Sequence, residues 1–399
     1  MRPDALARLI CAHVCLHACM AGTRMAAPLL ALRDGYSALS VGALMALFAL
    51  APVFLAIPSG RYADRHGLRR PVGLAVIASV LAASLAVAAP VFAVMCVAAL
   101  VTGGSTGAAS IALQRHVGRA AHGSTDLKRM FSWLAIGPAV SNFIGPLCAG
   151  LLIDHAGAVA GHTTGYRAAF GLMALLPLVA WLLIRRIEEL EPVVRAPGAA
   201  PTRPWDLLAN PMMRRLMLVN WCMSSCWDVH TFVVPVLGHE RGFSASTVGT
   251  ILGSFAMAAA GVRVLLPVFA ARLAEHAVLA SAMLVASLVF LVYPFMGNAW
   301  TMGGCSVVLG IALGSVQPMV MSTMHQITPE ARHGEALGLR AMAINGSSVL
   351  MPVLFGTVGA IVGVNLVFWT VGVVVCSCLQ PAWRLRPPAP PGQAASDKS

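Results

Sequence analysis

Long apolar runs with almost no charged side chains follow one another along this chain, separated by short polar segments. A helix needs on the order of 20 apolar residues to cross a bilayer, and its backbone groups must bond within the segment because hydrocarbon offers no partners. The runs therefore predict an all-α polytopic membrane protein with twelve transmembrane helices. They lie at residues 6–31, 40–59, 71–89, 91–113, 131–153, 167–186, 214–238, 246–269, 276–296, 299–321, 336–361 and 364–383.

The composition excludes a water-soluble protein. Of the 399 residues, 58% are hydrophobic and 11% are charged, a balance that no soluble domain of this length carries on its surface. In a soluble protein the formal net charge of +12 would suggest a nucleic-acid partner. Here the basic residues gather in particular loops, so we expect a lipid bilayer and no nucleic acid as partner.

The basic residues also predict the orientation. If the N-terminus is cytoplasmic, only Arg33, Arg167 and Arg241 fall in segments on the outer side. The other arginines and lysines in or near the loops, Arg340 among them, are inside. Cytoplasmic loops carry such an excess. We therefore expect a multi-pass protein of a bacterial inner membrane with both termini in the cytoplasm.

The predicted helices form two groups of six. We expect an N-terminal six-helix bundle at residues 1–186 and a C-terminal six-helix bundle at residues 214–383. Residues 187–213, which are rich in proline and glutamate and have no apolar period, are the predicted cytoplasmic linker. Residues 384–399 are proline-rich and are predicted to form a disordered cytoplasmic tail.

The two halves repeat each other. Residues 35–38 (GYSA) return as residues 242–245 (GFSA), and residues 61–64 (RYAD) are echoed by residues 272–275 (RLAE). Repeats in the same order indicate two pseudo-symmetric bundles of parallel topology. Such an arrangement places the binding site at the interface of the bundles, near the bilayer midplane.

The segment between the second and third predicted helices carries the strongest motif. Residues 60–70 read GRYADRHGLRR. Two glycines suit a tight turn, and a single carboxylate stands among four arginines, so we expect a short hairpin loop at the membrane surface. The order Gly-x-x-x-Asp-Arg-x-Gly-x-Arg-Arg resembles the signature loop of the major facilitator superfamily of secondary transporters, except that Tyr62 stands where the family usually has Leu.

This resemblance implies a conformational latch made of Gly60, Asp64, Arg65, Gly67 and Arg69. In that superfamily the aspartate pairs with a neighbouring arginine and caps a helix end in the second half, and the latch holds the cytoplasmic side shut while the outside is open. The alternative is a solvated carboxylate that contributes nothing measurable. A switch needs a bistable element, which favours the latch.

Two further motifs resemble those of bacterial twelve-helix drug/proton antiporters. The fifth predicted helix carries Gly145, Pro146 and Gly150, where small residues let another backbone approach and proline bends the helix. Gly22 and Pro28 match a spacing found in the first helix of these exporters. The resemblance indicates export, although small residues and prolines are also common in membrane helices. The fourth helix lacks the arginine usual in these antiporters, so any proton coupling must use other groups.

Polar side chains inside the apolar runs are candidates for the transport site, because a charge in hydrocarbon is costly. We predict that Arg24 and Asp228 approach each other in at least one state, as an outer gate or a proton-sensitive pair. A purely structural ion pair is the alternative. The predicted substrate and coupling cavity contains Arg24, His17, Asp228, Thr231, Gln317 and Asn345.

Other polar residues within the runs are given packing or surface roles. His230 faces away from Asp228 and is predicted to be a packing or lipid-edge histidine. Arg263 lies near the cytoplasmic end of the eighth helix and is predicted to reach the surface. The cysteines of the first helix form a stripe nearly opposite His13 and His17, so these groups cannot share an ion, and we expect no metal and no cofactor.

These observations predict a secondary active transporter of a small molecule that works by alternating access as a monomer, with proton-coupled efflux of a drug or metabolite as the main hypothesis. The alternative is proton-coupled uptake of an organic anion, with Arg24, Arg263 and the histidines as counter-charges. An enzyme would gather a nucleophile and base, or metal ligands, at one membrane face. A receptor would carry a sizeable soluble segment. The sequence offers neither, so we do not expect an enzyme.

Overall fold

The computed structural model describes residues 3–160, 162–190, 203–243 and 245–385, and all regular structure in this part of the chain is helical. The first half contains α1 (Pro3–Arg33), α2 (Ala38–His66), α3 (Arg69–Ala88), α4 (Phe92–Arg119), α5 (Gly123–Ala160) and α6 (His162–Ile184). The second half contains η1 (Pro204–Ala209), α7 (Pro211–Glu240), α8 (Ala245–Phe269), η2 (Ala270–Arg272), α9 (Glu275–Val292), η3 (Tyr293–Phe295), α10 (Ala299–Ile327), η4 (Glu330–Arg332), α11 (His333–Val362), α12 (Val364–Ser377) and α13 (Leu379–Trp383).

Each apolar run of the sequence corresponds to one long helix, and the last run is divided between α12 and α13. Ten of the helices are long and apolar enough to cross a membrane over the residues that the structure describes. The helices α7 and α11, each of 30 residues, do not meet that criterion there. The chain is therefore a helical membrane protein, and the number of twelve crossings stays a prediction.

The helices extend beyond their apolar runs, which corrects the expected loop between the second and third helices. Residues 60–66 form the last turns of α2, and only Gly67 and Leu68 separate α2 from α3. Gly67 has a positive φ of 74°, a conformation that glycine adopts without strain and that ends the helix. Asp64 consequently stands on a helix rather than in a loop. Hydropathy detects only the part of a helix that lies in hydrocarbon, so it missed these polar turns.

The predicted linker also contains a short ordered element. Residues 204–209 form the 3-10 helix η1, and α7 begins at Pro211 instead of residue 214. Arg69 and the carboxylate of Glu189 fix the start of the linker to the first turn of α3, because Glu189 accepts hydrogen bonds from the backbone N–H groups of Leu68 and Arg69. The predicted disordered tail lies outside the described residues, apart from Arg384 and Leu385.

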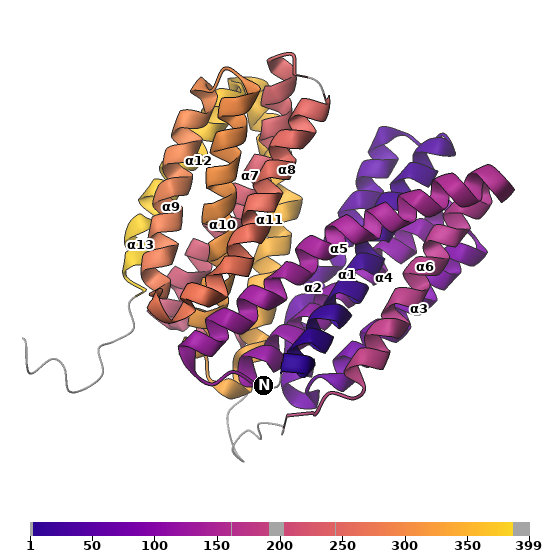
Figure 1. Cartoon of the computed structure of the whole chain (residues 1–399), viewed down its shortest axis with the longest axis horizontal. Coiled ribbons are helices and arrows are strands. Elements are labelled where there is room, and N and C mark those ends of the chain that lie inside the picture. Colours follow the sequence, from indigo (N-terminus) through magenta and orange to yellow (C-terminus); the bar gives the residue numbers. More distant parts are fainter. Residues whose placement is uncertain (1–2, 161, 191–202, 244, 386–399) are drawn as a thin grey trace, which may run out of the picture.

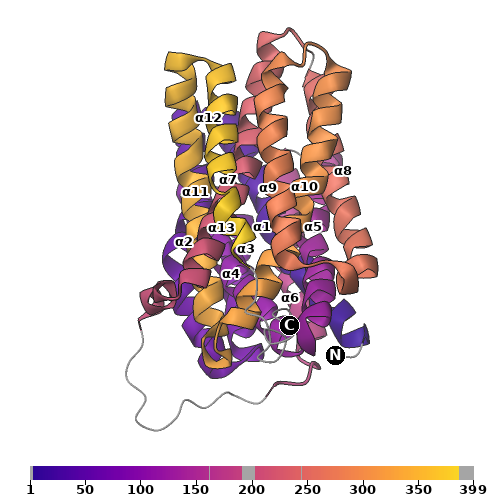
Figure 2. The ribbon, with the colours of Figure 1, turned by 90° about the vertical axis from the view of Figure 1, so that its left-hand side faces the viewer.

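The helices gather into two groups. In Figure 1, α1 to α6 form one group and α7 to α13 the other, and the two groups come together at the end where the N-terminus lies. Figure 2 shows the same end from the side, with the beginning and end of the linker beside it. We call it the α2–α3 end, because the turn between α2 and α3 is bound to the linker there. Across the groups, α2 packs on α11, and α5 packs on α8 and α10.

Buried apolar side chains also join the two groups at the α2–α3 end. Near the α2–α3 end, Leu9, Ala63 and Leu113 of the first group belong to a continuous buried cluster that includes most of the second group's core. Two further clusters are made only of α1–α6 residues, one with Leu30 and Phe170 and the other with Met173. The two groups therefore share a core at the α2–α3 end, and the first group also has buried clusters of its own.

Glycines allow α2 and α11 to touch along their backbones. A Cβ atom added at Gly60 would overlap the carbonyl oxygen of Gly334, and a Cβ added at Gly338 would lie 2.5 Å from the carbonyl oxygen of Ala56. No ordinary side chain fits at such a distance. Small residues at these positions are thus a condition for the close helix contact that joins the two groups.

This contact can be tested with two identical substitutions on one helix. Gly338→Ala adds a methyl group against α2, whereas Gly346→Ala adds one where nothing lies within 4 Å. Both changes raise helix propensity by up to about 1 kcal/mol, so their difference isolates the contact. We expect faster hydrogen–deuterium exchange at residues 60–66 and 333–338 in Gly338→Ala and unchanged exchange in Gly346→Ala. Equal exchange in the two variants would show that the contact does not depend on the absent side chain.

Candidate substrate cavity and the closed end

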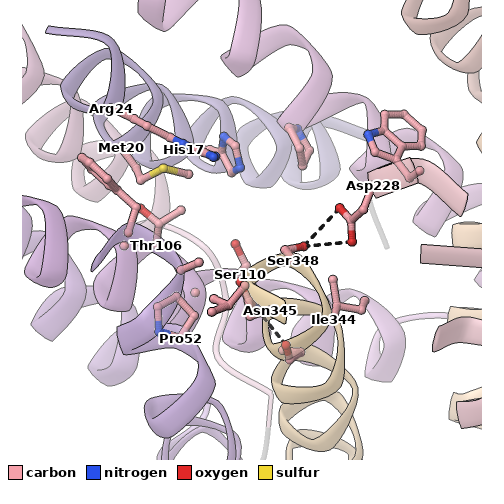
Figure 3. Close-up of a pocket in the computed structure, with 18 of the residues that line it drawn as sticks. His17, Met20, Arg24, Pro52, Thr106, Ser110, Asp228, Ile344, Asn345 and Ser348 are labelled. Carbon is pink, nitrogen blue, oxygen red and sulfur yellow. Dashed lines mark hydrogen bonds between the residues drawn. The ribbon is translucent and has the colours of Figure 1, made fainter. Parts of the chain in front are cut away.

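A cavity of about 870 Å³ lies between the two groups of helices. Its wall is formed by α1, α2, α4 and α5 on one side and by α7, α10 and α11 on the other (Figure 3). Apolar residues such as Met45, Phe48 and Trp227 line it together with a small number of polar and charged groups. That volume and that mixture are typical of sites for small organic molecules.

The structure brings together all six residues that the sequence suggested for the cavity. Arg24 and His17 reach it from α1, and the remaining four reach it from α7, α10 and α11: Asp228, Thr231, Gln317 and Asn345. Two of these side chains are bound to their own helix. The hydroxyl of Thr231 donates to the Trp227 carbonyl at 3.0 Å, and the amide of Asn345 donates to the Ala341 carbonyl at 2.7 Å.

Arg24 and Asp228 face the same cavity from opposite walls, and no ion pair joins them in this structure (Figure 3). The Asp228 carboxylate accepts hydrogen bonds from the Ser348 hydroxyl at 3.3 and 3.4 Å. Among the described residues, neither a base pairs with Asp228 nor an acid with Arg24. Both charges therefore face the cavity without a partner of opposite sign.

Two histidines of α1 lie in the same wall. The Nε2 atom of His13 is 3.0 Å from the Ser110 hydroxyl of α4, and the rings of His13 and His17 meet edge to face at 6.1 Å between centroids. In the part of the chain that the structure describes, no group of three or more His, Cys, Asp or Glu side chains could hold a metal ion. The polar wall thus consists of amide, hydroxyl, imidazole, guanidinium and carboxylate groups.

Arg340 is a cavity residue that the sequence analysis missed. It was counted among the cytoplasmic charges, but it lies in the third turn of α11, lines the cavity and is only 8% exposed. Its Nε donates to the Asn220 side-chain oxygen at 2.9 Å. The signal was available, because position 340 falls inside the predicted helix 336–361, and a charge within an apolar run is a functional candidate by itself.

At the α2–α3 end, the Asp64 carboxylate joins three helices. One oxygen accepts from Arg115 Nε of α4 at 2.6 Å and from the backbone N–H of Gly334 at 2.8 Å, and the other accepts from the N–H of Glu335 at 3.1 Å. The first N–H groups of a helix have no intrahelical partner and carry the positive end of its dipole. Asp64 therefore caps the start of α11 in the second group.

Further ion pairs surround this contact. Glu335 accepts from Arg61 at 3.0 Å and from Arg332 at 2.7 Å, and Arg119 pairs with Glu330 at 2.7 Å. A second set lies between α5 and the start of α9, where the Lys128 ammonium is 2.7 Å from the Leu273 carbonyl and 3.7 Å from the Glu275 carboxylate. Except for the Arg332–Glu335 pair, which lies within the second group, these bonds cross between the two groups of helices, so the end is closed by charge as well as by packing.

The other residues of the predicted latch divide into two sets. Gly60 and Gly67 serve the backbone, one in the α2–α11 contact and one in the turn. Arg69 donates through Nε to the Ile187 carbonyl at 3.0 Å and so holds the linker instead of the second group. Arg65 is exposed and has no partner among the described residues.

The predicted surface position of Arg263 is wrong. Its side chain is 7% exposed, and its Nη1 donates to the Ala135 carbonyl of α5 at 3.0 Å. Its Nε lies 3.4 Å from the Gly314 carbonyl of α10. That carbonyl lacks its usual helical donor because residue 318 is a proline and has no N–H. Two backbone carbonyls, one of them freed by a proline, hold this arginine inside the protein. Both lie on other helices, so hydropathy cannot report the contact.

The same chemistry recurs one turn farther along α8. Pro267 cannot donate to the carbonyl of Arg263. The Ser132 hydroxyl of α5 donates to that carbonyl instead, at 3.0 Å. Two bonds in opposite directions therefore connect α5 with α8 across the groups.

The motif of α5 lies in a helix contact within the first group. A Cβ added at Gly145 would be 2.6 Å from the Ala18 carbonyl of α1, and one added at Gly150 would be 3.2 Å from the Met25 methyl group. Pro146 lies within α5. None of the three is among the described residues that line the cavity.

His230, predicted to be a packing or lipid-edge histidine, is fully buried. It stacks on Phe255, and its Nε2 atom lies 2.9 Å from the Ser306 hydroxyl.

Solved structures with this architecture are transporters. The human organic anion transporter MFSD10 (TETRAN) matches with a TM-score of 0.76 and 16% identity over 96% of this chain and 100% of its own. Escherichia coli FucP in its outward conformation matches with a TM-score of 0.79 and 15% identity over 97% and 99% of the two chains. A bacterial homologue of the iron transporter ferroportin, in its outward-facing state, has a TM-score of 0.72 and 14% identity over 96% and 98%.

At identities this low, the structural likeness shows a common fold and carries no information about the substrate. No curated protein sequence matches the chain. The family model described as Major Facilitator Superfamily matches at residues 9–305 and 216–399, which together span nearly the whole chain. The protein therefore belongs to the major facilitator superfamily, whose members are transporters.

Proposed function

We propose that this protein is a proton-coupled secondary transporter of a small molecule and that its two bundles, residues 1–186 and 214–383, rock about the central cavity. The observation that carries the proposal is a cavity between the bundles, lined by unpaired charges, next to an end where the bundles share their core and their ion pairs. The protein would act as a monomer in a bacterial inner membrane, cross it twelve times and keep both termini in the cytoplasm. The α2–α3 end would then be the cytoplasmic end.

In this proposal the contact around Asp64 is the latch of the outward-open state. The carboxylate binds both Arg115 within its own bundle and the start of α11 in the other bundle. When the bundles rock apart, the bonds to α11 break and the bond to Arg115 is kept. Such a contact has two discrete arrangements, as a switch requires.

The latch predicts the effect of Asp64→Asn. This change keeps the size of the side chain but removes the negative charge that faces the first N–H groups of α11. A charge at a helix N-terminus contributes about 0.3–2 kcal/mol, and this contribution is present only while the end is closed. In a variant background without native cysteines, a cysteine at Gln114 should then react faster with a membrane-impermeant maleimide added to the cytoplasmic side. The matched change Asp34→Asn, at an exposed residue of the opposite end, should leave the rate unchanged. An unaltered rate in Asp64→Asn would rule out the latch.

Asp228 is the candidate proton carrier. Its carboxylate faces the cavity and is hydrogen-bonded only by the hydroxyls of Ser347 and Ser348 among the described residues, which leaves it free to take a proton. Asp64 differs, because an arginine and two backbone N–H groups occupy its oxygens.

The proton role predicts the behaviour of Asp228→Asn. The neutral amide cannot exchange a proton, so transport driven by a pH gradient should fall to background in proteoliposomes, and exchange of substrate without a gradient should persist. Asp154→Asn, at an exposed aspartate of α5, is the matched control and should behave as wild type. Transport by Asp228→Asn with the rate and pH dependence of wild type would remove Asp228 from the mechanism.

Two directions of transport have separate support. The glycine and proline motifs of α1 and α5 support export, as in drug/proton antiporters, and Gly145 packs on α1 where the resemblance expects a close contact. The arginines of the cavity support uptake of an organic anion. Among proteins of this fold, FucP is described as a fucose:proton symporter and MFSD10 as an organic anion transporter.

Energised everted vesicles distinguish the two directions. An exporter should accumulate its substrate in the vesicle lumen in exchange for protons, whereas a symporter for uptake should empty preloaded vesicles together with protons. A panel of toxic compounds and carbon sources, tested for growth of an overexpressing strain with and without an uncoupler, supplies the compounds to load. Accumulation that resists the uncoupler would contradict proton coupling in either direction.

A further inference from the structure

We propose that Arg340, held by Asn220, binds the anionic group of the substrate, and that the cavity takes a small organic anion together with a proton. The inference rests on the proposed transport function and names its substrate class. The observation that carries it is a buried guanidinium that lines the cavity and has no acidic partner among the described residues.

The other buried lysine and arginine side chains of the described residues have charged or backbone partners. Arg115 pairs with Asp64, Lys128 lies near Glu275, and Arg263 donates to two backbone carbonyls. Arg340 differs from them. Its Nε donates to an amide oxygen, and neither of its terminal nitrogens has a partner in the described part of the chain.

An uncompensated charge at this burial is destabilising, so its presence calls for a ligand. A guanidinium has five N–H donors in a planar fork, a geometry that matches a carboxylate. Asn220 is itself buried and fixes the orientation of the fork through the bond to Nε. The terminal nitrogens are thereby left for a ligand in the cavity.

The balance of charge in the cavity selects the sign of the substrate. Its fixed charges are two arginines, Arg24 and Arg340, and one carboxylate, Asp228. The cavity is therefore positive by one charge when Asp228 is ionised and by two when it is protonated. A cation would have to approach both arginines, whereas an anion neutralises them.

The rest of the wall suits an organic body. Met45, Phe48, Trp227, Ile344 and Val349 contribute apolar surface around the charged groups. A cavity of about 870 Å³ accommodates a small molecule with an apolar part and one charged end. An inorganic anion would leave most of this surface uncovered.

The same charges couple the anion to the proton. A proton on Asp228 removes a negative charge from the cavity and so strengthens binding of an anion, and the bound anion strengthens proton binding by the same factor. The titratable or charged side chains that line the cavity with Asp228 are His13, His17 and Arg24 on α1 and Arg340 on α11. Each of these four is positive when charged, so none reverses the sign. Proton and anion should therefore cross the membrane in the same direction, as in a symporter.

The test measures binding without transport, on the full chain purified in detergent. The probes are benzoate, benzamide and benzamidine, which share a ring and differ in charge. Affinities come from the rise of the unfolding temperature with probe concentration. We expect wild type to bind benzoate best of the three, and Asp228→Asn to bind it about fivefold or more tightly, because the variant lacks the negative charge.

Variants inside and outside the cavity test whether Arg340 binds the anion. Arg340→Gln should weaken benzoate binding about tenfold or more, the loss typical of a charged hydrogen bond. Asn220→Asp keeps the shape of the side chain but gives Arg340 an internal carboxylate partner, so it should weaken benzoate binding to a similar extent. Arg186→Gln removes an exposed charge outside the cavity and should bind as wild type.

Three results would overturn the assignment: benzoate affinity unchanged in both Arg340→Gln and Asn220→Asp, benzamidine as the best ligand, or no stabilisation of wild type by benzoate. Weaker binding of benzoate in Asp228→Asn would overturn the coupling to the proton. The proposed function fails separately. If Asp228→Asn transports with the pH dependence of wild type while benzoate binding still requires Arg340, the anion site stands without proton coupling through Asp228.

Discussion

The contact of Asp64 with the start of α11 decides which end of this molecule is closed. A carboxylate in a protein interior is stable only when its oxygens are occupied, and here an arginine and two backbone N–H groups occupy them. The glycines of the two helices make that geometry accessible, because a side chain at Gly60 or Gly338 would hold α2 and α11 apart. Charge and close packing therefore depend on each other at this end.

Prolines contribute to the same interface from within the helices. Each proline leaves one carbonyl without its helical donor, and two such carbonyls, of Arg263 and Gly314, are taken up by Ser132 and by Arg263 itself. The sites that bend α8 and α10 thus also connect them to other helices. In a membrane interior these polar contacts hold helices together where burial of apolar surface cannot.

Much of the fold could be predicted from the sequence, because the bilayer forces apolar runs into helices. The candidate cavity residues could also be suggested, since a polar side chain in an apolar run avoids lipid, and His17, Arg24 and Asp228 do face one cavity. Helix ends could not be placed, as the polar last turns of α2 show. Contacts between residues far apart in the sequence could not be predicted either. Arg263 was predicted at the surface and Arg340 was counted among the cytoplasmic charges, because neither Ala135 nor Asn220 can be identified as a partner from local sequence.

The account as a whole requires that the two bundles move as bodies, so that one end closes when the other opens. Pulsed electron–electron double resonance measures this directly. One spin-label pair is placed at the α2–α3 end and another at the opposite end, and distances are recorded in lipid nanodiscs over a series of pH values. We predict complementary populations, with each shift to longer distances at one end matched by a shift to shorter distances at the other. Distances that change independently, or that lengthen at both ends together, would contradict alternating access about the cavity.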